Sequence, residues 1–145
     1  MSDTAGIIIL IGRILFVIFP GWVSGTQFHL RQPQGAEGYA QATGFPLPKL
    51  ASYPAGAWLV AASLSIALGI FPDIGALMMG LFVVLTAFYF HAFWKIDDQE
   101  QRSVQSSNFW RNVIMLGACF MMFGFFASVD QGLRYTITDS LISLR

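Results

Sequence analysis

Four apolar runs dominate this sequence and constrain its fold more than any other feature. They cover residues 6–28, 55–71, 74–94 and 110–126. A helix needs about 20 mostly apolar residues to cross a bilayer core, so each run is long enough, or nearly long enough, to span a membrane. Charged residues make up only 11% of the chain, whereas a soluble domain carries about 25%. The sequence therefore predicts an all-α, four-helix transmembrane bundle rather than a soluble enzyme.

The charge balance limits the partners of the chain. Eight Lys and Arg residues offset eight Asp and Glu residues, and no basic stripe is visible, so we expect no nucleic-acid partner. The expected partners are membrane lipid and other membrane-protein subunits. All 145 residues fit one membrane domain. We expect a multi-pass protein of a bacterial or archaeal cytoplasmic membrane, or of a membrane derived from one.

The connections between the runs differ in kind. Residues 31–54 form a long polar segment whose prolines prevent one continuous helix. Pro72 and Asp73 make a tight turn, so the second and third runs should form an antiparallel hairpin. Residues 95–109 are predicted to be a polar loop, in which the carboxylates face solvent.

The C-terminal tail, residues 127–145, returns to mixed polarity. Thr138 and Asp139 are potential N-capping residues, and they precede a stretch that contains Leu141, Ile142 and Leu144. This pattern predicts a short helical turn that lies against the bundle or against a partner at the membrane surface.

Four spans place the two long connections on one side of the membrane and both termini on the other. The connection side carries five basic residues, namely Arg31, Lys49, Lys95, Arg102 and Arg111. The opposite side carries Arg134 and Arg145, together with Arg13 if its side chain reaches the surface. The positive-inside rule therefore favours cytoplasmic connections.

Arg13 is the only charged residue inside the first run. A charged side chain within the bilayer is costly, so Arg13 should face the bundle and find hydrogen-bond acceptors there. Asp73 and Asp130 flank the same membrane face, and either could pair with it. We favour a structural ion pair over a contact to an anion or a quinone carbonyl.

The two histidines, His29 and His91, occupy the C-terminal ends of the first and third runs. These helices run in the same direction, so both residues should lie at one depth on the connection side, near Arg31 and Trp94. One interpretation is a quinone or substrate site formed by these four residues. A second is that the rings only hydrogen-bond at the membrane interface. A haem or a metal is the least supported alternative, and no carboxylate lies within these helix ends to complete a di-metal site.

Two further patterns have structural explanations. Gly21 and Gly25 form a small-xxx-small motif, which indicates close packing between helices of one bundle rather than a dimer. The four tryptophans lie near span ends, which is typical of an aromatic belt at the membrane surface. They are Trp22, Trp58, Trp94 and Trp110. No motif identifies a catalytic residue, so whether the chain is an enzyme stays open.

Several short motifs follow one another along the chain. They are Gly12-Arg13-Ile14-Leu15-Phe16, Gly44-Phe45-Pro46-Leu47-Pro48, Ala67-Leu68-Gly69-Ile70, Asp73-Ile74-Gly75-Ala76-Leu77, His91-Ala92-Phe93-Trp94, Phe109-Trp110-Arg111-Asn112-Val113 and the tail motif Gly132-Leu133-Arg134-Tyr135-Thr136-Ile137-Thr138-Asp139. In order and spacing they resemble the DoxX family of small four-helix membrane proteins.

The resemblance implies a redox-associated membrane subunit, because the family takes its name from a thiosulfate:quinone oxidoreductase. Many relatives carry a glutamate in the second helix, but residues 56–69 here contain no acidic residue, so that residue's role is not carried over. The leading hypothesis is a membrane subunit of a larger redox or electron-transfer complex that contacts quinone. The alternative is a non-catalytic accessory subunit that stabilises a membrane assembly and binds lipid and neighbouring helices.

Overall fold

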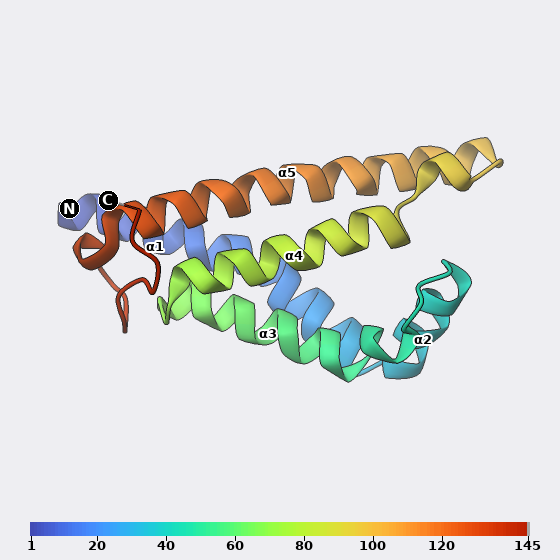
Figure 1. Cartoon of the computed structure of the whole chain (residues 1–145), viewed down its shortest axis with the longest axis horizontal. Coiled ribbons are helices and arrows are strands. Elements are labelled where there is room, and N and C mark those ends of the chain that lie inside the picture. Colours follow the sequence, from blue (N-terminus) through green and yellow to red (C-terminus); the bar gives the residue numbers. More distant parts are fainter. Residues whose placement is uncertain (145) are drawn as a thin grey trace.

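A computed structural model describes residues 1–144, apart from the side chain of Asp130. Arg145, counted above for topology, lies outside these residues. Every regular element within them is a helix, which confirms the all-α prediction. In chain order the elements are α1 (Asp3–Val17), the π-helix η1 (Ile18–Leu30), α2 (Pro33–Ala42), the 3-10 turn η2 (Pro48–Ala51), α3 (Tyr53–Leu68), α4 (Pro72–Phe90), the 3-10 turn η3 (Phe93–Lys95), α5 (Gln99–Val129) and the 3-10 turn η4 (Asp130–Gly132) (Figure 1).

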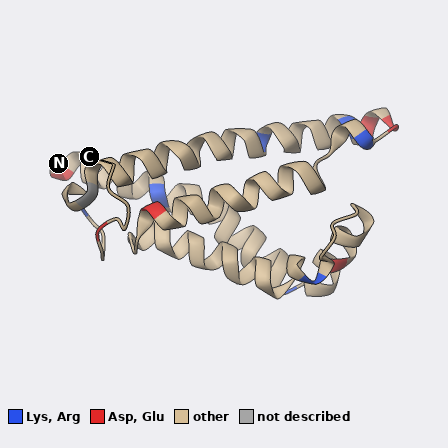
Figure 2. Ribbon diagram, viewed as in Figure 1, with Lys and Arg blue, Asp and Glu red and all other residues tan. Residues whose placement is uncertain are grey.

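Three helical stretches are long and apolar enough to cross a membrane, namely Asp3–Leu30, Pro72–Lys95 and Gln99–Val129. The fourth apolar helix, α3, has 16 residues. At 1.5 Å per residue it spans about 24 Å, somewhat less than a typical bilayer core. Charged residues lie mostly toward the ends of the helices, whose middle sections are largely uncharged (Figure 2). The chain is therefore a multi-pass integral membrane protein.

The long helices pack one against the next, η1 on α3, α3 on α4 and α4 on α5. The two termini and the α3–α4 turn lie at one end of the bundle, whereas α2 and the start of α5 lie at the other (Figure 1). Buried side chains from α1, α3, α4 and α5 form the core, and they include Val17, Leu59, Ile66, Met79 and Cys119. Cys119 is thus a structural residue of the core.

The first span changes its helix type near the middle. α1 ends at Val17 and continues as η1, in which each N–H binds the carbonyl five residues back. The change falls beside Pro20, which has no N–H to donate and clashes with the preceding turn of an α-helix. A proline inside a helix commonly produces a kink, and here the backbone accommodates Pro20 by changing to a wider helix.

Gly21 and Gly25 allow η1 to approach α3 closely. A Cβ atom at Gly21 would lie 2.6 Å from the Ser63 side chain, and one at Gly25 would lie 3.2 Å from the Cβ of Leu59. Both distances are too short for an ordinary contact. The glycines therefore pack two helices of one chain together, as the sequence predicts.

The predicted hairpin of α3 and α4 is confirmed. Gly69, with φ of 66°, ends α3 in the left-handed conformation that glycine adopts without steric cost. Pro72 then occupies the first turn of α4, where its missing N–H has no intrahelical partner to lose. The two helices are in close contact next to this turn. A Cβ added at Gly75 would overlap the Ser65 hydroxyl and lie 3.0 Å from the Ala62 carbonyl.

The connection between α4 and α5 is shorter than the sequence suggests. α5 begins at Gln99 and occupies most of the segment 95–109, so the prediction of a polar loop there is wrong for most of its length. The Asp98 carboxylate accepts a 2.8 Å hydrogen bond from the N–H of Gln101, which is the geometry of an N-cap. The polar residues after this cap include good helix formers, so their helix propensity supports a helix without an apolar run.

The tail packs on the bundle, as expected, but the helical turn predicted for residues 138–144 is not formed. The N–H of Leu141 donates to the Asp73 carboxylate at 3.1 Å, and that of Ile142 does so at 2.8 Å. The N–H of Leu144 donates to the Ala127 carbonyl at 3.0 Å. These amides bind the bundle instead of carbonyls one turn back, and that excludes a helix.

Candidate ligand-binding cavity

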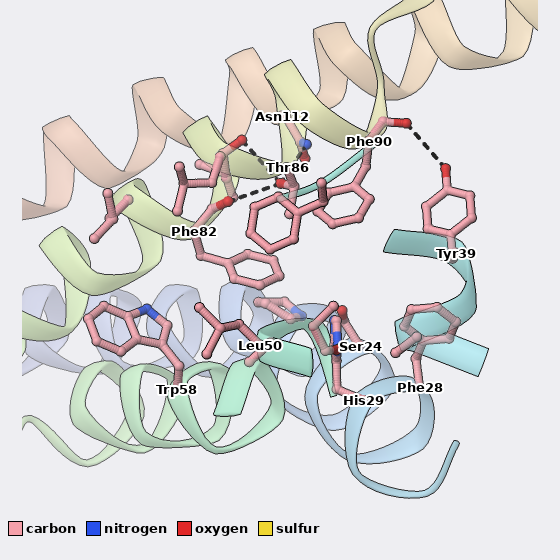
Figure 3. Close-up of a pocket in the computed structure, with 18 of the residues that line it drawn as sticks. Ser24, Phe28, His29, Tyr39, Leu50, Trp58, Phe82, Thr86, Phe90 and Asn112 are labelled. Atoms are coloured by element: carbon pink, nitrogen blue, oxygen red, sulfur yellow. Dashed lines mark hydrogen bonds between the residues drawn. The ribbon is translucent and has the colours of Figure 1, made fainter. Parts of the chain in front are cut away.

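A cavity of about 500 Å³ lies between the η1–α3 pair and α4, at the end of the bundle that holds α2. Its walls are rich in aromatic side chains, namely Phe19, Phe28, Tyr39, Phe45, Trp58, Phe82 and Phe90. Apart from the Tyr39 hydroxyl, the polar side chains on its walls are Ser24, His29, Thr86, His91 and Asn112. Phe82 and Thr86 face Trp58 and Leu50 across the space (Figure 3). An aromatic enclosure with a few polar groups is the usual pattern of a site for a small ligand.

The cavity forms beyond the point where α3 and α4 are in close contact. At the hairpin turn, Gly75 brings the two backbones together. Farther along, the indole of Trp58 on α3 donates a 2.8 Å hydrogen bond to the carbonyl of Met78 on α4. A bulky ring thus bridges the two helices at this level, and the cavity opens beside it. The sequence assigns Trp58 to an aromatic belt, and its place in the cavity wall was not predicted.

His29 is buried, with 8% of its surface exposed, and it links three elements at the cavity. Its Nδ1 hydrogen-bonds to the carbonyl of Ala51 in η2. Its ring lies edge-on to Phe28, at 5.0 Å between centroids, and to Phe82 on α4, at 5.9 Å. These contacts hold the imidazole in one orientation.

His91 follows the last residue of α4 and is half-buried. Its Nδ1 lies 2.8 Å from the side-chain oxygen of Gln105 on α5. His29 and His91 both line this one cavity, although they belong to different helices. The directions of the two helices predict this shared location. A ligand role for them stays a prediction.

Arg31 and Trp94, which the sequence groups with the histidines, are not among the residues that line the cavity. Arg31 follows η1, is exposed and donates to the side chain of Gln27 at 3.0 Å. Trp94 lies in η3 and packs against Phe88 and Phe109, with ring centroids 6.2 and 5.5 Å away. Because α4 ends at Phe90, Trp94 does not sit one helical turn beyond His91 and does not cover the cavity.

Two polar contacts at the cavity were not predicted. The side-chain amide of Asn112 on α5 donates to the Thr86 hydroxyl on α4 at 3.0 Å. The Tyr39 hydroxyl on α2 donates to the Phe90 carbonyl at 3.2 Å, with the two rings stacked at 5.6 Å (Figure 3). An amide and a hydroxyl inside apolar runs are a signal that sequence analysis could have used for Asn112 and Thr86. Tyr39 lies in a polar connection and carries no such signal.

Arg13 lies away from the cavity and is buried, with 2% of its surface exposed. It faces inward, as predicted, but its acceptors are backbone carbonyls. Its Nε donates to Ile66 at 2.8 Å, and one terminal nitrogen donates to Ala67 at 2.6 Å and to Tyr135 at 2.9 Å. Among the described side chains, no ion pair joins Arg13 to Asp73. The prediction that Asp73 pairs with Arg13 is therefore wrong. Asp130, the other proposed partner, has no described side chain.

Asp73 is fully buried at the start of α4, where it holds the tail through the amides of Leu141 and Ile142. These amides stabilise its carboxylate in place of a cation. In the part of the chain that the structure describes, no group of three or more His, Cys, Asp or Glu side chains could hold a metal ion.

The model of the DoxX family matches residues 8–92, which is more than half of the 145 residues. The match runs from α1 to just beyond α4 and contains every cavity-lining residue except Asn112 and Met115. The similar motifs at residues 109–113 and in the tail lie outside it. The chain has no match among curated proteins or among solved structures. Because the family model matches more than half of the chain, this membrane protein belongs to the DoxX family.

Proposed function

We propose that this protein is a ligand-binding membrane subunit of a redox assembly and that its cavity holds the head group of a quinone. The observation that carries the proposal is the aromatic cavity lined by both histidines. Its volume of about 500 Å³ falls within the range of known small-molecule sites. Flat aromatic walls suit a planar ring, and the few polar side chains can orient its oxygen atoms.

The exposure of the cavity walls supports a ligand that arrives from the lipid. Phe19 on η1 and Leu81 on α4 both line the cavity, yet they are 63% and 52% exposed. Both lie in membrane-spanning stretches, so their exposed surface faces the bilayer. A molecule dissolved in the membrane could therefore enter sideways and leave its apolar tail in the lipid.

The redox assembly is proposed from membership of the DoxX family together with this cavity. The cavity supplies apolar walls and hydrogen-bonding side chains for the quinone ring. A partner protein would supply or accept the electrons. The accessory role that the sequence also allows differs in one respect, because it requires no saturable binding of a quinone.

The test is the binding of decylubiquinone to the protein in lipid nanodiscs, measured by equilibrium dialysis. Ala55 lines the cavity on α3, whereas Ala57 on the same helix is exposed and lies outside it. We expect Ala55→Phe to fill part of the cavity and to weaken binding at least about tenfold, or ~1.4 kcal/mol. The matched variant Ala57→Phe should bind like the wild type. Equal binding by both variants, or no saturable binding by the wild type, would contradict the proposal.

A further inference from the structure

We propose that His29 makes the cavity selective for a ring that carries a hydroxyl group, so that the hydroquinone form of a ligand binds more tightly than the quinone form. This inference rests on the proposed function and deepens it. The hydroxyl would donate a hydrogen bond to Nε2 of His29, which acts as an acceptor. His29 is thus assigned as a specificity-determining residue.

The tautomer of His29 follows from its partner. Nδ1 contacts the backbone carbonyl of Ala51, and a carbonyl oxygen can only accept a hydrogen bond. The proton must therefore reside on Nδ1. A neutral imidazole has a single N–H, so Nε2 carries a lone pair. It can accept a hydrogen bond from a hydroxyl, but it cannot donate one to a quinone carbonyl.

The Ala51 carbonyl that accepts from His29 is held in place by its surroundings. Ala51 is buried, and the next residue, Ser52, donates its hydroxyl to the Lys49 carbonyl at 2.8 Å. A backbone carbonyl cannot exchange donor and acceptor by rotation, in contrast to a side-chain amide. The position of η2 therefore determines that Nδ1 of His29 carries the proton and that Nε2 is left as the acceptor.

Among the described residues, no hydrogen bond joins Nε2 of His29 to a donor, and the hydrogen bond of its ring is made through Nδ1. The rings nearest to the imidazole are Phe28 and Phe82, and neither has an N–H or O–H group to offer. Nε2 is not among the buried polar atoms that lack a partner, and His29 lines the cavity, so its lone pair is open to a molecule there. A ligand hydroxyl would satisfy it, whereas a quinone oxygen would place a second acceptor against it.

His91 does not impose the same selection, although it lines the same cavity. Its Nδ1 contacts the side chain of Gln105, whose amide presents an acceptor on one arm and a donor on the other. Either tautomer of His91 can therefore be accommodated. The contrast between a fixed carbonyl and a rotatable amide makes His91 a natural comparison for His29.

The experiment compares decylubiquinol with decylubiquinone under anaerobic conditions, using the protein in nanodiscs. We expect the wild type to bind the quinol about threefold to tenfold more tightly, which corresponds to one hydrogen bond. His29→Phe should bring this ratio to about one. His91→Phe should change both affinities by the same factor and preserve the ratio. Equal affinity of the wild type for the two forms would overturn the selectivity and leave the proposed function intact.

A second measurement uses only the wild-type protein, so it does not require a variant to fold. In wild-type protein labelled with nitrogen-15 at histidine, the ring nitrogen shifts distinguish the two neutral tautomers. We expect one histidine to be protonated at Nδ1 and to change its Nε2 shift when decylubiquinol is added. A His29 ring protonated at Nε2 would overturn the inference. If neither ligand form binds saturably, the proposed function and this inference fail together.

Discussion

The Nε of Arg13 on α1 donates a 2.8 Å hydrogen bond to the carbonyl of Ile66, in the last turn of α3. The carbonyls at a helix C-terminus lack intrahelical donors and carry a partial negative charge. A buried guanidinium therefore stabilises the end of α3 and is itself stabilised by it. The same group also binds the carbonyl of Tyr135 at 2.9 Å. Arg13 thus joins the first helix, the α3–α4 hairpin and the tail.

Removing this guanidinium should destabilise the fold. Arg13→Leu would leave the carbonyls of Ile66, Ala67 and Tyr135 without their donor. We expect a loss of roughly 2–4 kcal/mol in the free energy of unfolding. Arg13→Lys keeps the charge but lacks the planar fork of donors, so its loss should be smaller. Thermal unfolding in detergent measures both, and a wild-type midpoint for Arg13→Leu would contradict this account.

Loss of the Asp73 carboxylate should release the tail. In Asp73→Ala the amides of Leu141 and Ile142 lose their acceptor, so hydrogen exchange over residues 140–144 should become much faster. Asp139 is exposed in the same tail, and Asp139→Ala should leave the exchange of these amides unchanged. Mass spectrometry of deuterated peptides tests the pair. Continued protection of residues 140–144 in Asp73→Ala would show that another contact holds the tail.

The close approach of α3 and α4 should tolerate no side chain at Gly75. A Cβ there would overlap the Ser65 hydroxyl, which is itself held by a 2.7 Å hydrogen bond to the Ile70 carbonyl. Gly75→Ala should therefore cost about 1–3 kcal/mol through overpacking. A Cβ at Gly117 in α5 would have nothing within 4 Å, so Gly117→Ala should be neutral or slightly stabilising. Denaturation of the two variants side by side checks the difference in stability.

The contact between α2 and the end of α4 should affect how long a ligand stays. Tyr39→Phe keeps the ring that stacks on Phe90 but removes the hydroxyl that binds the Phe90 carbonyl. If α2 covers the outer end of the cavity, dissociation of decylubiquinone should become about twofold to fivefold faster, because one partly exposed hydrogen bond is lost. Stopped-flow dilution measures the rate. An unchanged dissociation rate would place the exit route away from α2.

The sequence alone determined that the apolar runs form helices and that the chain turns back between the second and the third of them. In a bilayer a long apolar run has to satisfy its own backbone hydrogen bonds, and a helix does so. Gly69 and Pro72 stop one helix and start the next for reasons of local backbone geometry. The inward orientation of the Arg13 side chain also followed from the sequence, because a charged side chain in contact with lipid costs free energy. Helix direction also predicted that His29 and His91 lie at the same end of the bundle, and both line one cavity there.

Only the tertiary structure decided which groups meet those side chains. Arg13 binds backbone carbonyls, and every residue has one, so no residue type in the sequence marks them as its partners. The start of α5 depends on a cap by Asp98 outside the membrane, where hydropathy is no guide to helix formation. The cavity exists because α3 and α4 touch at Gly75 and make room beside Trp58. Such a space results from packing between residues far apart in the chain, which periodicity cannot reveal.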